Sequence, residues 1–115
     1  MEDRTKLGKM RRLQQCATPN GALAILAVDH RNSLRRALNP EEPEAVPGDD
    51  LAMFKQKVVS ALGPSASAVL MDPEYGAPRV IETGALPGAT GLVVSLEESG
   101  YQGDPTARES RLLPG

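Results

Sequence analysis

Unbroken apolar runs alternate with helical apolar stripes along this chain. Residues 22–28, 66–71 and 91–96 are runs without polar alternation, a pattern typical of strands that are buried on both faces in a parallel sheet. Before and between these runs, apolar residues recur every three or four positions, which predicts helices at residues 2–17, 32–38, 50–62 and 77–83. The predicted order is helix, strand, helix, helix, strand, helix, strand and a long loop.

The helix over residues 50–62 has the clearest amphipathic pattern. Its apolar stripe, with spacings of three, four and four, consists of Leu51, Phe54, Val58 and Leu62. Lys55 and Lys57 fall between these positions, so both are predicted to lie on the polar side of the helix.

Each predicted strand is followed by a carboxylate, namely Asp29, Asp72 and Glu97. Strands separated by helices imply right-handed parallel crossovers. The carboxyl ends of parallel strands lie along one edge, where α/β proteins bind ligands. We therefore expect the three acids to share a site, in which neighbouring carboxylates can act as general acid and base. The alternative is that each acid only opens a turn or caps the next helix.

Two further candidates directly follow Asp29. His30, the sole histidine, can bind a substrate hydroxyl or carry a proton, or it can simply end the strand. Arg31 suits a phosphate or sulfonate group. Asp29 and Asp72 can alternatively hold a divalent metal through oxygen ligands, although their spacing matches no dense acidic loop.

Composition narrows the class of protein. The 115 residues suffice for one small domain, and the formal charge of −2 argues against a nucleic-acid partner. No apolar run approaches the roughly 20 residues of a membrane helix. Cys16 is the only cysteine, which excludes an internal disulfide, and the charged first residues lack the pattern of a secretory signal. We therefore expect a cytoplasmic protein with neither a nucleic-acid nor a membrane partner.

Three motifs give the chain a family resemblance. Together they resemble the tagatose-1,6-bisphosphate aldolase family, with its related sulfofructose-phosphate aldolases. The Asp-Pro-Glu-Tyr-Gly sequence is the most distinctive part. The motifs are Leu-Ala-Val-Asp-His-Arg-Asn-Ser-Leu at residues 26–34, Val-Leu-Met-Asp-Pro-Glu-Tyr-Gly at 69–76 and Leu-Glu-Glu-Ser-Gly-Tyr at 96–101.

The resemblance implies a (β/α)₈ TIM barrel that cleaves a ketose phosphate by class I chemistry, in which a lysine forms a Schiff base with the substrate carbonyl. It implies no metal and no other cofactor. Asp29 is the expected catalytic residue. Asp29, His30 (a Gln in many relatives), Arg31, Asp72 and Glu97 are the expected substrate-binding residues.

The chain departs from the family in length. A TIM barrel needs about 250 residues, and the family's imine-forming lysine lies on a later strand. The lysines of this chain are Lys6, Lys9, Lys55 and Lys57, and we assign none of them to the imine. The expected fold is thus α/β, the N-terminal part of an incomplete barrel with about three parallel strands.

Residues 1–115 are expected to form one segment of a single domain. It divides into an N-terminal helix and turn at residues 1–20, three strand and helix units at 21–97 and a long loop at 98–115. The expected partners are a small-molecule ketose phosphate and the missing C-terminal part of the barrel, with a homo-oligomer left open. Alone, the segment is expected to be inactive and prone to aggregation, because it would expose an unpaired strand edge.

Two other functions remain compatible with the residues. In one, a free-standing α/β module binds a small anionic or polyol ligand through the strand-end acids and Arg31. In the other, a metal-dependent lyase uses Asp29 and Asp72.

Overall fold

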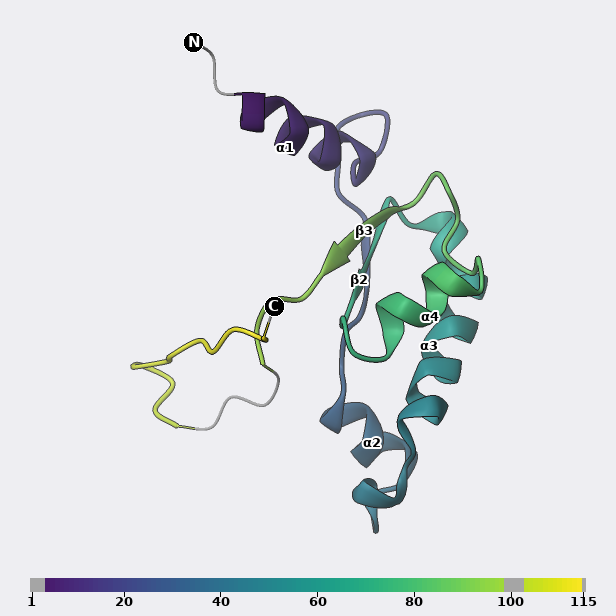
Figure 1. The fold of residues 1–115 in the computed structure, drawn as a ribbon, viewed down its shortest axis with the longest axis vertical. Coiled ribbons are helices and arrows are strands. Elements are labelled where there is room, and N and C mark those ends of the chain that lie inside the picture. The colour runs from purple at the N-terminus through teal and green to yellow at the C-terminus, as the bar shows by residue number, and fades with distance from the viewer. Residues whose placement is uncertain (1–3, 99–102, 115) are drawn as a thin grey trace.

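The computed structural model describes residues 4–98 and 103–114 of the chain. Helices and strands alternate as the apolar pattern predicts (Figure 1). Short 3-10 helices lie at η1 (Pro43–Ala45) and η2 (Gly63–Ser65). The main elements are α1 (Arg4–Gln15), β1 (Ile25–Val28), α2 (Asn32–Leu38), α3 (Gly48–Leu62), β2 (Ala68–Met71), α4 (Gly76–Glu82) and β3 (Gly91–Val94).

The strands form one parallel sheet in the order β1-β2-β3. At the carboxyl ends of the strands Val28 pairs with Met71, and Met71 pairs with Val94. The predicted α/β class and the parallel strands are therefore confirmed. The arrangement is compatible with part of a barrel, because the strands follow one another in chain order with helices between them.

Helices α3 and α4 cover one face of the sheet (Figure 1). The buried core between them contains Val28, Val69 and Met71 from the sheet, Val59 from α3 and Val80 from α4. Since side chains alternate along a strand, Ile25 and Ala27 belong to the opposite face. Both are exposed.

The prediction that all strands are buried on both faces is correct for β2 and wrong for the two outer strands, β1 and β3, where Ile25 and Val94 are exposed. Ala68, Val69 and Met71 are fully buried, whereas Ile25 is 43% exposed. The cause is position: β2 has a neighbour on either side, while β1 and β3 are edge strands in the described sheet.

The first and third strands are shorter than predicted because other segments bind their ends. The carbonyl of Ala22 accepts a hydrogen bond from the Thr18 N–H at 2.7 Å, so residues 18–22 form a turn. Beyond β3, the carbonyl of Leu96 accepts a bond from the Leu113 N–H at 2.7 Å. The chain after β3, predicted as a loop, thus returns to the end of the sheet.

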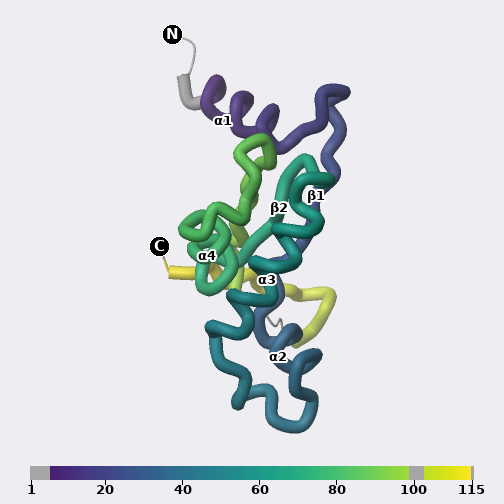
Figure 2. Tube along the Cα trace, turned by 90° about the vertical axis from the view of Figure 1, so that its right-hand side faces the viewer, coloured from purple at the N-terminus to yellow at the C-terminus, as the bar shows by residue number. Residues whose placement is uncertain are grey.

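Helices α1 and α2 lie at opposite ends of the molecule (Figure 2). The last turn of α1 contacts the start of β3, where a Cβ on Gly91 would lie 2.6 Å from the Cys16 Sγ. Helix α2 follows β1 at the carboxyl end of the sheet. In the described part of the chain, no helix combines the length and apolar character that crossing a membrane requires.

Candidate functional site

The residues predicted for the site lie at the carboxyl edge of the sheet. Asp29 directly follows β1, Asp72 directly follows β2, and Glu97 is the third residue after β3. Because the strands are parallel and in register at Val28 and Met71, the sheet brings these chain segments to one edge.

Arg31 ties two of the strand ends together. Its Nη2 donates a hydrogen bond to the backbone carbonyl of Glu97 at 3.1 Å. Only 7% of Arg31 is exposed, so its guanidinium is held inside this edge rather than extended into water. The Glu97 side chain is exposed, and its backbone forms an antiparallel bridge with Leu112.

Asp29 and His30 are the accessible members of the group. Asp29 is half-buried and His30 is exposed. Asp29 lies just outside β1, and its charge acts on the buried Lys55. Because its side chain is only half-buried, a ligand at the carboxyl edge of the sheet can reach it.

Asp72 is engaged within the protein. The side chain is fully buried and forms an ion pair with Lys55. Its Oδ2 also accepts the N–H groups of Tyr75 at 2.7 Å and Glu74 at 3.2 Å, while Oδ1 accepts the N–H of Gly76 at 3.2 Å. One carboxylate thus organises the whole turn from Asp72 to Gly76. Contact between Asp72 and a substrate stays a prediction.

The position of Lys55 in the structure differs from the predicted one. The prediction that it lies on the polar side of its helix is wrong, because its side chain is fully buried. The buried stripe of α3 is Leu51, Lys55 and Val59, whereas Phe54 is 38% exposed. The spacing of four on either side of Lys55 was visible in the sequence, but a lysine is almost never fully buried without a partner.

The buried pair shifts the pKa values of both groups. Burial lowers the pKa of Lys55, and this effect outweighs the opposing hydrogen bond and charge of Asp72 and the more distant charge of Asp29. For Asp72, burial raises the pKa. Hydrogen bonds from Lys55, Tyr75 and Gly76, together with the charge of Lys55, outweigh burial and leave the pKa below its usual value.

The same contacts bear on the metal hypothesis. Within residues 4–98 and 103–114, no group of three or more His, Cys, Asp or Glu side chains is arranged to hold a metal ion. Asp72, one of the two ligands considered, already binds Lys55 and three backbone N–H groups. A metal bound there would have to displace Lys55.

Comparison with known proteins identifies relatives that share one name. The chain is 33% identical to the tagatose 1,6-diphosphate aldolase of Streptococcus agalactiae over 100 residues, which are 87% of this chain and 30% of that protein. It is 37% identical over 94 residues to the enzyme of that name in Listeria monocytogenes, covering 82% of this chain and 27% of the relative. Tagatose 1,6-diphosphate aldolase 2 of Enterococcus faecalis is 32% identical over 108 residues, or 92% of this chain and 31% of the relative.

These matches confirm the resemblance to the N-terminal portion of tagatose 1,6-bisphosphate aldolases. The chain spans about three-tenths of the length of these curated relatives. No protein-family model matches it.

Proposed function

We propose that this relative of the tagatose 1,6-diphosphate aldolases is the N-terminal part of a class I aldolase. The proposed enzyme cleaves a ketose phosphate, similar to tagatose 1,6-bisphosphate or sulfofructose phosphate, into two three-carbon products. One observation carries the proposal. The three motifs that resemble this family all lie where the parallel strands end, at one edge of the sheet. Asp29, His30 and Arg31 follow β1 there, and Glu97 lies beyond β3.

The proposed reaction needs an amine and a proton acceptor. A lysine amine attacks the ketose carbonyl, and loss of water gives an imine. A base removes the proton of the C4 hydroxyl, the C3–C4 bond breaks, and its electron pair moves into the imine. The aldehyde product leaves, C3 takes up a proton, and water hydrolyses the imine to release the second product. No cofactor takes part in this scheme.

Asp29 is the proposed proton carrier in this scheme, since it is half-buried at the carboxyl edge of the sheet. His30, Arg31 and Glu97 are proposed to bind substrate hydroxyl or anionic groups. Asp72, also proposed for this site, would act chiefly by fixing the turn that it organises.

The imine-forming lysine is proposed to lie beyond residues 1–115. Lys55 is fully buried and paired with Asp72, and the imine requires a neutral amine that a substrate can reach. Lys6, Lys9 and Lys57 are exposed side chains of α1 and α3. None of these three belongs to a strand.

We also propose that the complete fold is a (β/α)₈ barrel in a cytoplasmic enzyme. In that fold β1 and β3, the outer strands of the described sheet, pair with strands outside this segment. Residues 1–20, 21–97 and 98–115 keep their proposed roles as the N-terminal helix and turn, the three strand and helix units, and the loop. Residues 1–115 alone are proposed to be inactive, because they lack the imine-forming lysine. They are also proposed to be prone to aggregation, because Leu23, Ile25 and Leu96 are exposed.

An aldol-cleavage assay tests the proposal. The gene product that carries this segment is expected to cleave a ketose phosphate, and residues 1–115 alone are not. Asp29→Asn should lower kcat by roughly 10²- to 10⁴-fold, the range for a lost general acid or base. Glu44→Gln, at an exposed position in η1, serves as the matched control and should leave the rate unchanged.

Other outcomes of the same assay separate the alternatives. Activity that disappears on chelation and returns with a divalent cation would favour the metal-dependent lyase. Reversible binding of the ketose phosphate without cleavage would favour the binding module. Normal turnover by residues 1–115 alone would contradict the fragment proposal.

A further inference from the structure

The Asp-Pro-Glu-Tyr-Gly motif contains a tyrosine that has no part in the proposed reaction. Tyr75 lies in the turn between β2 and α4. Its backbone N–H donates to Oδ2 of Asp72 at 2.7 Å, and the other oxygen of that buried carboxylate binds Lys55. The ion pair in the core therefore fixes the backbone of Tyr75.

The ring of Tyr75 is held by both neighbouring helices. It packs against a small hydrophobic cluster that consists of Leu34 from α2, Val46 and Leu51 from α3. It also lies close to the start of α3, where a Cβ on Gly48 would be 2.5 Å from the Cε1 of Tyr75. The glycine leaves just enough room for the ring, so backbone contacts and packing together set where the hydroxyl lies.

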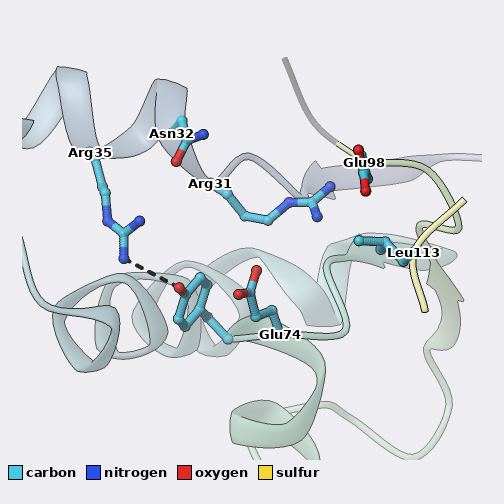
Figure 3. A pocket seen from close by; sticks show the side chains of 7 residues that line it. Arg31, Asn32, Arg35, Glu74, Glu98 and Leu113 are labelled. Atoms are coloured by element: carbon cyan, nitrogen blue, oxygen red, sulfur yellow. Dashed lines mark hydrogen bonds between the residues drawn. The ribbon is translucent and has the colours of Figure 1, made fainter. Parts of the chain in front are cut away.

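Arg35 of α2 contacts that hydroxyl. Its Nη2 donates to the Tyr75 hydroxyl at 3.3 Å, a bond drawn as a dashed line in Figure 3. The guanidinium carbon lies 5.4 Å from the centre of the Tyr75 ring, within the range of a cation–π contact. The Nε of Arg35 donates to the Val46 carbonyl at 3.2 Å. The arginine is thus fixed by the turn after β2 and by the chain that leads into α3.

The same arginine fixes the chain that follows β1. Its backbone N–H donates to the carbonyl of Arg31 at 3.1 Å. Asp29 and His30 therefore lie between two anchored residues, Val28 in β1 and Arg31 at the start of α2. A displacement of Arg35 would move the second of these anchors.

We propose that Tyr75 is a positioning residue, whose hydroxyl acts through Arg35 to fix Asp29 and His30 at the carboxyl edge of the sheet. Reacting groups must be held within about 0.5 Å of their productive geometry, and the contacts from Asp72 through Tyr75 supply such a constraint. The effect on catalysis rests on the proposed function, because that function makes Asp29 the proton carrier. The effect on the position of this segment does not.

Tyr75→Phe tests the proposal, because it removes the hydroxyl and keeps the ring. In the gene product that carries this segment, labelled with ¹⁵N-histidine, the variant should shift the backbone N–H signal of His30. His30→Gln identifies that signal by its loss. Arg36→Gln, at an exposed position of α2, is the matched control and should leave it in place. A role of Tyr75 in stability alone would also leave this signal of the folded protein unchanged.

The aldol-cleavage assay measures the consequence for the reaction. Tyr75→Phe should lower kcat/KM about tenfold, below the roughly 10²-fold loss that a displacement of about 1 Å can cause. Arg35→Met should lower it similarly. The double variant should be no slower than the slower single variant, because both changes remove the same hydrogen bond.

A glycine variant tests the position of the ring without changing either partner of that bond. Gly48→Ala displaces the Tyr75 ring and should also shift the His30 signal and lower kcat/KM severalfold. Gly88→Ala, which has open space around its Cβ, is the matched control and should do neither.

The outcomes for Tyr75 and for the aldolase are separable. A shifted His30 signal in Tyr75→Phe but not in Arg36→Gln supports the positioning role, even where the unsubstituted protein cleaves no ketose phosphate. An unshifted signal in Tyr75→Phe would overturn it. In an active enzyme, equal kcat/KM values in Tyr75→Phe and Arg36→Gln, or losses that simply add in the double variant, would overturn it as well.

Discussion

Replacing Lys55 by methionine should destabilise the protein far more than the same change two residues later. Lys55→Met keeps most of the volume of the side chain but leaves the fully buried Asp72 without its cation. Breaking a buried ion pair on one side costs about 3–5 kcal/mol. Three backbone N–H groups still bind Asp72, so we expect the lower end of that range, about 3 kcal/mol.

Urea unfolding followed by circular dichroism measures the effect in the gene product that carries this segment. Lys57→Met, on the exposed side of α3, is the matched control and should change the free energy of unfolding by less than about 0.5 kcal/mol. Lys55→Met combined with Asp72→Asn should cost at least about 2 kcal/mol less than the sum of the two single changes, because neither charge is then left alone. Equal losses in Lys55→Met and Lys57→Met would refute the reasoning.

Three further changes test single contacts of the fold. Because the pKa of Asp72 lies below its usual value of 3.8, the stability it contributes is constant above that value and is lost as pH falls through its folded pKa. Asp72→Asn should therefore flatten the fall in urea midpoint between about pH 5 and pH 2. Gly76→Ala should cost about 1–3 kcal/mol by thermal unfolding, since its Cβ would lie 2.8 Å from Asp72 Oδ1; Gly88→Ala, with open space around it, should not. Thr90→Val should cost about 1 kcal/mol in the same measurement, through loss of the 3.1 Å bond from its hydroxyl to the Gly63 carbonyl.

The parallel order of the strands was predictable because it depends on features that a sequence displays directly. Runs without alternation, separated by helical spacing, leave few arrangements other than parallel strands joined by crossovers. The carboxylates that follow those runs were accordingly placed at the correct edge. Asp29 and Arg31 follow β1 as predicted, and their roles in a site stay predictions.

The buried pair was not predictable from apolar spacing. Lys55 enters the core because Asp72, 17 residues further along the chain, accepts a hydrogen bond from its ammonium group there. Apolar periodicity treats Lys55 as a polar, exposed position. It therefore predicts a buried face of α3 that includes Phe54 instead of Lys55. Lys55 points inward because α3 packs against the turn after β2, and this packing is a tertiary contact.

The edge strand and the loop after β3 show the same limit. The apolar pattern predicts one continuous strand over residues 22–28. In the structure, the carbonyl of Ala22 instead accepts a hydrogen bond from the Thr18 N–H. The bond from the Leu113 N–H to the Leu96 carbonyl joins residues that share no apolar pattern. Hydrogen bonds between backbone groups are available to almost every residue, so sequence alone did not identify these partners.

Trapping of the imine tests the central claim most directly. The gene product that carries this segment would be incubated with a ketose phosphate, reduced with borohydride and digested for mass spectrometry. The account predicts a stable substrate adduct on one lysine outside residues 1–115, with Lys55 unmodified and with the adduct still formed in Asp29→Asn, because Asp29 acts after the imine has formed. Cleavage of the sugar with no adduct on any lysine would contradict it, as would an adduct on Lys55.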